Sequence, residues 1–187
     1  MATVDELTRD ARHRMDRSVD ATHTEFNSVR TGRASPALLD RIHVDYYGQP
    51  TPLKQLATIS APEPRLLSIQ PFDPSSVKAI EKALLESDLG LTPSNDGKLI
   101  RLPIPQLTEE RRKELVKVVR HMAEEGRVAV RNVRRDVIHH LKQLGDDGDI
   151  GADEEHRAEE LVQKVTDEHV AKIDDLLKHK EAEIMEV

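Results

Sequence analysis

A row of arginine and lysine residues between positions 113 and 142 is the part of the sequence best suited to binding a partner. At about 100° per residue on a helix, eight cations gather on one face, interrupted only by Glu124 and Ile138. The guanidinium group of arginine presents several donors in a fixed fork that matches phosphate oxygens. The row therefore predicts a helix face that grips an anion, foremost the phosphate backbone of RNA. Its members are Lys113, Lys117, Arg120, Arg127, Arg131, Arg134, Arg135 and Lys142.

The basic row has a second explanation, a solvated strip that pairs with acids of a neighbouring helix. Eight cations within about 120° of arc, with one acid among them, exceed what such pairing easily uses. All four aromatic residues of the chain lie elsewhere, so base stacking on this helix is not expected. Recognition of RNA would then depend on phosphate positions and on shape rather than on base sequence.

Other residue combinations predict no reaction chemistry. His139 and His140 are helix neighbours about 100° apart and cannot share a tetrahedral ion. The Asp147-Gly-Asp149 loop resembles a calcium loop, but Gly151 and Ala158 occupy two of the ligand positions. The chain has no cysteine and shows no phosphate-binding loop, nucleophile elbow or dinucleotide fingerprint. We therefore expect no metal, no cofactor, no small-molecule substrate and no enzyme activity.

Charge is spread unevenly over the 187 residues, whose formal net charge is −7. Residues 108–144 contain ten Lys and Arg against six Asp and Glu, whereas residues 145–187 contain five against fifteen. A basic row in an acidic protein favours a localised anionic partner. No segment approaches the ~18 apolar residues of a membrane span, and the N-terminus lacks the apolar run of a signal peptide. These features, with the absence of cysteine, predict a soluble cytoplasmic protein.

Three long amphipathic segments must position the basic row. Residues 3–30 open with a capping box, Thr3-Val-Asp-Glu6, and end near Gly32. The second helix starts after a cap at Thr108 and stops at Gly145-Asp-Asp-Gly148. The third runs from about Asp153 to Ile184. None is apolar all round, so each buries one stripe against the others in an elongated antiparallel three-helix bundle.

The apolar stripes of these helices follow steps of three and four residues. On the second helix we expect the stripe opposite the basic row, with Gly126 at a missing beat. On the third helix His169 falls on the stripe, which predicts a packed, hydrogen-bonded interior histidine rather than a switch. The second stripe comprises Leu115, Val119, Met122, Ala129, Val133, Val137, Leu141 and Leu144, and the third Ala158, Leu161, Val165, His169, Ile173, Leu176 or Leu177, and Ile184.

Residues 31–105 differ in character, because all ten prolines lie between Pro36 and Pro105. Proline at that density excludes long helices. Short strands are expected at residues 42–47, 53–59, 65–70 and 99–102, with a helix at 75–87 capped by Ser75 or Ser76 and a turn at 94–97. Tyr46 and Tyr47 could mark a partner surface, although one of two adjacent strand residues normally points inward.

This pattern predicts an α+β, mainly α protein in which a small β/α/β domain is inserted into the bundle. The bundle comprises residues 1–30 and 106–187, and the inserted domain residues 31–105. Hinges are expected near residues 30–34 and 103–106, through Thr31, Gly32, Pro103 and Pro105.

Six strings in order along the chain resemble the ribosome recycling factor family. The resemblance runs from end to end without a visible insertion. The strings are Val29-Arg-Thr-Gly-Arg-Ala-Ser-Pro36, Asp45-Tyr-Tyr-Gly-Gln-Pro-Thr-Pro-Leu53, Ser87-Asp-Leu-Gly-Leu91, Pro105-Gln-Leu-Thr-Glu-Glu-Arg-Arg-Lys113, Val128-Ala-Val-Arg-Asn-Val-Arg-Arg-Asp136 and Lys178-His-Lys-Glu-Ala-Glu-Ile184.

The resemblance implies an L-shaped, tRNA-like protein that acts as a monomer on the 70S ribosome after peptide release. It implies binding across the A and P sites of the large subunit. It also implies subunit dissociation with elongation factor G and GTP hydrolysis, which releases mRNA and deacylated tRNA. By position, Arg131 and Arg134 match the family's contacts with 23S rRNA, and Arg30 and Arg33 match arginines near the hinge that also meet RNA.

Combining the resemblance with the face analysis, we predict one set of residues that bind ribosomal RNA. The set is Arg131, Arg134, Arg135, Arg127, Arg120, Lys117, Arg30 and Arg33.

Two alternative functions would each require features of their own in the sequence. A helical scaffold or adaptor without RNA binding would need apolar residues on the outer faces, where the second helix instead carries Lys and Arg. A catalytic domain on a helical stalk would need a catalytic constellation that the sequence lacks.

Overall fold

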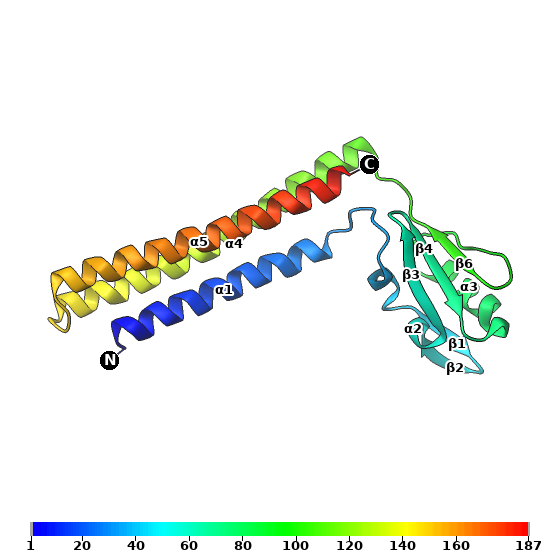
Figure 1. Ribbon diagram of the computed structural model, residues 1–187, viewed down its shortest axis with the longest axis horizontal. Helices are drawn as coiled ribbons and strands as arrows, with labels where there is room; N and C mark the ends of the chain where they lie inside the picture. Colours follow the sequence, from blue (N-terminus) through cyan, green and yellow to red (C-terminus); the bar gives the residue numbers. More distant parts are fainter. Residues whose placement is uncertain (1, 187) are drawn as a thin grey trace. The chain divides into compact units, whose positions relative to one another are not determined.

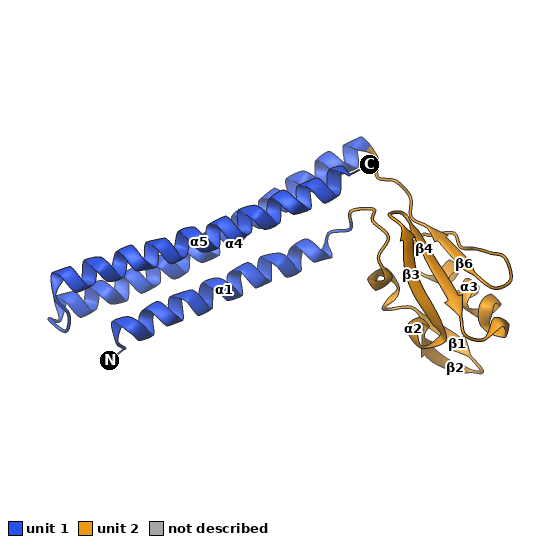
Figure 2. Ribbon diagram, in the orientation of Figure 1, with its two compact units in different colours: residues 1–30, 109–187 blue, residues 31–108 orange. Residues whose placement is uncertain are grey.

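The computed structural model describes residues 2–186, which form two compact units (Figures 1 and 2). Unit 1 comprises Met1–Arg30 and Glu109–Val187, and unit 2 comprises Thr31–Thr108.

Unit 1 is a bundle of three long helices, as the apolar stripes predict. Helix α1 spans Val4–Ser28, α4 spans Glu109–Asp146 and α5 spans Ala152–Met185. Each helix packs against the other two. Helix α4 is antiparallel to both neighbours. Its partners on α5 run backwards, from Glu181 at Arg120 to Gln163 at Arg134. On α1, Thr22 lies beside Gly126 and Arg14 pairs with Asp136.

The start of α1 confirms the predicted capping box. The Glu6 amide donates to Thr3 Oγ1 over 3.2 Å, and the Thr3 amide donates to Glu6 Oε2 over 2.8 Å. The end of the helix differs from the prediction, because α1 stops at Ser28 and Val29 is already extended. The Val29 amide donates to the carbonyl of Phe26, which closes the last turn before Gly32 is reached.

The buried stripes follow the predicted period with local shifts. On α4, Met122 and Ala129 are only half-buried, and their neighbours Ala123 and Val130 are fully enclosed instead. On α5, Leu161 is exposed and Val162 takes its place. An α-helix drifts about 20° per heptad against a strict seven-residue repeat, so a stripe packed on two neighbours moves to the adjacent residue.

His169 lies fully buried between α5 and α1, as the sequence predicts. Its Nδ1 is 2.6 Å from the carbonyl oxygen of Val165, and its Nε2 is 2.6 Å from Asp16 Oδ1. Both ring nitrogens of His169 are therefore within hydrogen-bond distance of an oxygen in the folded chain. The hydrogen bond from His169, supported by the charges of His169, Lys172 and Arg12, holds the pKa of Asp16 below its usual value.

Unit 2 contains two antiparallel sheets. Strands β1 (His43–Tyr46) and β2 (Gln49–Pro52) form a hairpin. The second sheet has the order β3-β4-β6-β5. Its strands are β3 (Ala57–Glu63), β4 (Leu66–Pro71), β5 (Ser94–Asn95) and β6 (Ile100–Pro103).

Short helices complete unit 2 and cover its core. They are the 3-10 turns η1 (Pro36–Leu39) and η2 (Pro74–Ser76), one turn of helix α2 (Leu53–Leu56) and helix α3 (Val77–Glu86). Fully buried side chains from the strands and from α3 form one apolar core, which includes Val44, Leu67, Ile69, Ile80 and Leu102.

Two local predictions in unit 2 were wrong. Residues 53–56 form a helical turn rather than part of a strand, because Leu53 and Leu56, three residues apart, turn the same way onto the core. The helical segment after β4 is capped by Asp73, not by Ser75 or Ser76. Asp73 Oδ1 accepts from the Ser75 amide over 2.9 Å, which leaves Ser76 without a side-chain capping bond.

The β1–β2 hairpin turns through Tyr47 and Gly48, both with positive φ. Tyr46 pairs with Gln49, which leaves a two-residue loop with φ of 51° at Tyr47 and 81° at Gly48. These values identify a type I′ turn, whose first position favours asparagine, aspartate or glycine. Tyr47 is the one non-glycine residue with positive φ between positions 2 and 186. The conformation costs about 1–2 kcal/mol for a residue with a Cβ.

Replacing Gly126 with alanine tests the close approach of α4 to α1. A Cβ there would overlap the Thr22 hydroxyl and lie 3.2 Å from Ile173 Cδ1. Thr22 cannot yield freely, since its hydroxyl donates to the Ser18 carbonyl over 2.9 Å. We expect Gly126→Ala to lower the free energy of unfolding by about 1–2 kcal/mol, even after alanine's gain in helix propensity.

Gly145→Ala is the matched control for this measurement. A Cβ at Gly145 meets only the far end of the flexible Glu155 side chain. Thermal unfolding should therefore show Gly145→Ala at or above wild-type stability. Equal melting temperatures for the two variants would contradict close packing at Gly126.

The Asp16–His169 pair predicts a pH-dependent stability. Because the folded-state pKa of Asp16 is depressed, its contribution is present above its unfolded pKa of about 3.9 and is lost as pH falls below that value. We expect Asp16→Asn to melt at a lower temperature than wild type at pH 7. That difference should shrink as the pH falls below about 4. Melting curves from pH 2.5 to 7 test this, and a constant difference would argue against the pair.

Candidate nucleic-acid interface

Helix α4 carries six of the eight predicted RNA-binding residues, and all six reach the surface at least in part. Arg30 lies at the end of the first segment of unit 1, and Arg33 belongs to unit 2. The six on the helix are Lys117, Arg120, Arg127, Arg131, Arg134 and Arg135, and together with Lys113 and Lys142 they make up the basic row.

The basic row lies on the flank of α4 beside α5, not on the face opposite the buried stripe as expected. Arg120 Nε is 2.5 Å from Glu181 Oε1, Arg127 NH2 is 2.7 Å from Asp174 Oδ1, and Arg134 NH1 donates to Gln163 Oε1 over 3.2 Å. These three partners all belong to α5. Around the axis of α4, at 100° per residue, the centre of the row lies only about 120° from the buried stripe. The row therefore borders the groove between α4 and α5. Part of the basic row therefore pairs with the acidic helix α5, which was the less favoured of the two explanations of the row.

Glu124, the one acid within the row, ties two arginines together. Its carboxylate accepts from Arg127 over 3.0 Å and from Arg131 over 3.2 Å. The hydrogen bond from Arg127, together with the charges of both arginines, holds the pKa of Glu124 below its usual value. Glu124 is therefore an ionised carboxylate held by two guanidinium groups.

The residues of the basic row differ in how free they are to meet a partner. Arg127 bridges Glu124 and Asp174, and only 19% of its side chain is exposed. Arg131 forms an ion pair with Glu124 alone among the residues that the structure describes, and 39% of its side chain is exposed. Arg135 and Lys117 are exposed and form no ion pair with any residue that the structure describes. Arg131, Arg135 and Lys117 are thus the cations most accessible to an anion, whereas Arg127 also holds α4 to α5.

The predicted hinge residues Thr31, Gly32, Pro103 and Pro105 lie in unit 2, at or near its two ends in the chain. Gly32 has a φ of 76°, and a Cβ there would lie 3.2 Å from Leu107 Cγ and 3.8 Å from the Pro105 carbonyl oxygen. The two connecting segments therefore pack side by side at Gly32. A side chain added at Gly32 would press on Leu107 in the second segment.

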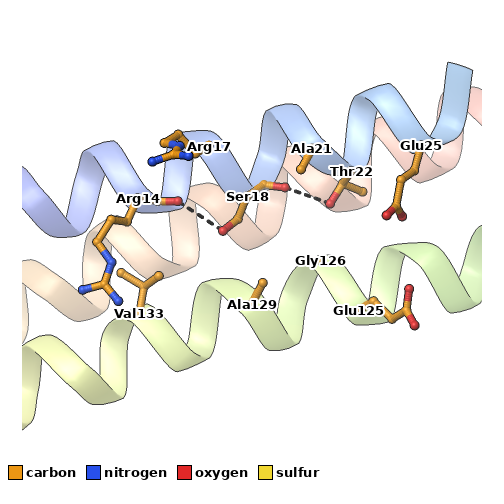
Figure 3. A pocket seen from close by; sticks show the side chains of 10 residues that line it. All are labelled: Arg14, Arg17, Ser18, Ala21, Thr22, Glu25, Glu125, Gly126, Ala129 and Val133. Atoms are coloured by element: carbon orange, nitrogen blue, oxygen red, sulfur yellow. Dashed lines mark hydrogen bonds between the residues drawn. The ribbon is translucent and has the colours of Figure 1, made fainter.

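A second feature of unit 1, a hollow between α1 and α4, escaped the sequence analysis. Small residues such as Ala21, Gly126 and Ala129 leave a space of about 420 Å³, with Arg14 and Arg17 toward one end and Glu25 and Glu125 toward the other (Figure 3). The missing beat at Gly126 was its only signal in the sequence. Arg14 is already paired with Asp136 Oδ2 at 2.6 Å, and Glu25 and Glu125 also line the hollow, so it holds no concentration of positive charge for an anion.

Groups of three or more histidine or acidic residues that could hold a metal ion are absent from positions 2–186. Among these residues no helix is long and apolar enough to cross a membrane.

Comparison with known proteins identifies the family to which this fold and basic row belong. The model of the family described as ribosome recycling factor matches residues 22–185. The chain belongs to the ribosome recycling factor family. These proteins are translation factors.

Individual members of the ribosome recycling factor family match over nearly the whole chain. The factor of Rubrobacter xylanophilus is 58% identical over 178 residues, covering 95% of this chain and 96% of that protein. The factor of Geobacillus sp. strain WCH70 is 55% identical over 184 residues, covering 98% and 100%.

Solved structures of ribosome recycling factors share the fold. A solution structure matches with a TM-score of 0.72 and 42% identity over the full length of both chains. The T. thermophilus factor matches with a TM-score of 0.63 and 49% identity, covering 99% of this chain and all of that one. That factor and E. coli elongation factor G are described as bound to the E. coli post-termination complex.

Arg127 and Arg135 provide a test that separates structural from accessible arginines. Because Arg127 joins α4 to α5 and is mostly buried, Arg127→Ala should lower the free energy of unfolding by about 1 kcal/mol. Arg135→Ala, which removes an exposed cation without an ion pair, should stay within about 0.5 kcal/mol of wild type. Chemical denaturation of both variants measures this, and equal losses would show that the two arginines are not distinguished by packing.

Proposed function

We propose that this protein recycles ribosomes after termination. It binds the large subunit across the A and P sites and, with elongation factor G and GTP hydrolysis, separates the subunits. Messenger RNA and deacylated tRNA are then released. The related T. thermophilus factor, described together with elongation factor G on a post-termination complex, supports this role.

The basic row of α4 is the proposed anchor on 23S rRNA. The observation that carries this step is the row of accessible cations Lys117, Arg131 and Arg135, which lie on one rigid helix in a protein of net charge −7. A fixed helix presents its guanidinium groups at constant spacing, which suits ribosomal RNA because its folded shape also fixes its phosphates. Arg120, Arg127 and Arg134 border these three, and Arg30 and Arg33 extend the proposed contact.

Binding to phosphate must displace the internal partner of Arg131. Within residues 2–186 its only ion pair is with Glu124, at 3.2 Å, and more than a third of the Arg131 side chain is exposed. Exposed pairs of this kind contribute little to stability, because water and salt screen them. A phosphate oxygen therefore competes with Glu124 at little cost in free energy. Until RNA binds, the ion pair with Glu124 keeps the Arg131 side chain oriented.

The proposed mechanism uses the two units as separate bodies. Unit 1 stays on RNA, while unit 2 takes up the displacement driven by elongation factor G through hinges at Thr31, Gly32, Pro103 and Pro105. The protein performs no bond chemistry itself in this scheme, and GTP is hydrolysed by its partner. It acts in the cytoplasm, where ribosomes translate.

Arg131→Glu tests the proposed anchor. Reversing the charge replaces an attraction to phosphate with a repulsion, so co-sedimentation with isolated large subunits should weaken at least about tenfold. Wild-type binding should fall steeply with salt, and the variant should show a smaller salt slope. Circular dichroism and melting temperature should stay close to wild type, because the side chain is partly exposed.

Arg9→Glu is the matched control, since it makes the same charge change at an exposed α1 position outside the row. It should bind like wild type. If both reversals weaken binding equally, net charge rather than the basic row governs it. Binding that ignores salt would reject the phosphate anchor.

A further inference from the structure

Glu124 occupies a position inside the basic row where the spacing calls for another cation. From Lys117 to Arg134 the row continues in steps of three and four residues. Glu124 stands at one of these steps, between Arg120 and Arg127. At 1.5 Å of rise per residue, successive steps lie about 4.5–6 Å apart along α4, and the two flanking arginines about 10.5 Å apart. Glu124 therefore breaks an otherwise continuous track of positive charge.

The other acids in this part of α4 are turned away from the row. At 100° per residue around the helix axis, Glu124 lies inside the arc of the cations. The three remaining acids, Glu114, Glu125 and Asp136, lie outside that arc. The acids of α5 that pair with the row do so from the groove beside it. Glu124 is thus the acid that lies among the cations themselves.

The Glu124 carboxylate is fixed in place and charged. Its Oε2 accepts from Arg127 and its Oε1 accepts from Arg131. The hydrogen bond from Arg127, together with the charges of both arginines, keeps the pKa of this carboxyl below its usual value, so it is ionised at neutral pH. Because 53% of the Glu124 side chain is exposed, the negative charge faces whatever binds the row.

Folding gives little reason for a carboxylate at this position. A pair three residues apart on an exposed helix surface adds little to helix stability. Arg127 is held to α5 by Asp174, at 2.7 Å, whether or not Glu124 is charged. The negative charge therefore matters more for what the row binds than for how α4 packs.

A negative charge inside the row selects among RNA molecules. RNA without a fixed fold has a flexible chain that can lay one phosphate after another along a line of cations. One of these phosphates would meet Glu124, and two like charges in contact repel each other. RNA with a fixed fold can place its phosphates beside the flanking cations and leave the position opposite Glu124 free of phosphate. The repulsion therefore disfavours unstructured RNA and spares a folded RNA of matching shape.

We propose that Glu124 is a specificity-determining residue of the RNA interface. It repels RNA whose phosphates run continuously along the basic row, and it admits folded RNA whose phosphates leave a gap at this position. This inference rests on the proposed function, because it names the residue that decides which RNA the anchor on α4 accepts.

Glu124→Gln tests the role of the charge, because glutamine keeps an oxygen to which both arginines can donate. Binding to oligouridine, which has no fixed fold, would be measured by fluorescence anisotropy over a salt series. At about 0.1 M salt we expect the variant to bind at least about fivefold more tightly than wild type, since one more phosphate contact becomes available. The salt slope should steepen by about 0.7 for the same reason. Unchanged affinity for oligouridine overturns the proposal.

Two further variants separate the charge at this position from net charge and from side-chain shape. Glu125→Gln makes the same charge change at an exposed residue on another face of α4 and should bind oligouridine as wild type does. Glu124→Asp keeps the charge on a shorter side chain and should also bind oligouridine as wild type does. If either variant tightens binding as much as Glu124→Gln, the proposal is wrong.

Binding to isolated large subunits distinguishes this inference from the proposed function. Glu124→Gln should bind them within about twofold of wild type, because folded RNA already leaves the gap, so the preference for large subunits over oligouridine should fall. An equal gain on both ligands would refute the role of Glu124 and leave the proposed function standing. Failure of the wild-type protein to bind large subunits would instead refute the proposed function.

Discussion

The structure of unit 1 depends on the burial of α4 against two helices at once. Its stripe must face both α1 and α5, and at Gly126 the helices come so close that a single methyl group would overlap Thr22. This constraint decides which α4 residues are left for a partner. Residues about 120° from the stripe border α5 and acquire acidic neighbours, whereas those turned further away remain in solvent. The basic row is therefore partly structural as a consequence of packing.

Much of this arrangement could be predicted from the sequence because helical periodicity is a local signal. The three helices, the capping box at Thr3 and the interior position of His169 all follow from spacing along one segment. The insert was also recognisable, since ten prolines within 70 residues exclude long helices. Helix ends and the exact buried residue were less predictable, as the shifts from Leu161 to Val162 and from Ser76 to Asp73 show. Those depend on hydrogen bonds and neighbours that only the folded chain supplies.

Helical spacing groups the residues of the candidate site, whose binding of RNA stays a prediction, but it does not reveal their electrostatics. Helical spacing groups Arg131 with Arg134 and Arg135, yet it does not show that Glu181, Asp174 and Gln163 on α5 face the same flank. Those residues lie 29–61 positions away in sequence, so their register against α4 is fixed by tertiary packing. Glu124 could have been noticed, because it stands three residues before Arg127 and seven before Arg131, both on its own face.

The distribution of charge and aromatic residues gives the two units different binding properties. Unit 1 carries a row of cations on a rigid helix and no exposed aromatic ring, since Phe26, its only aromatic, is buried. Unit 2 balances its charges and holds the other three aromatic rings. Unit 1 therefore attracts a polyanion strongly over long range, and unit 2 attracts it weakly. Short-range apolar contacts, in contrast, are favoured by unit 2 and not by unit 1. In the proposed mechanism, unit 1 stays on RNA while elongation factor G displaces unit 2, so the two partners meet separate bodies. If one unit met both partners, its displacement by the protein would also pull on the phosphate contacts.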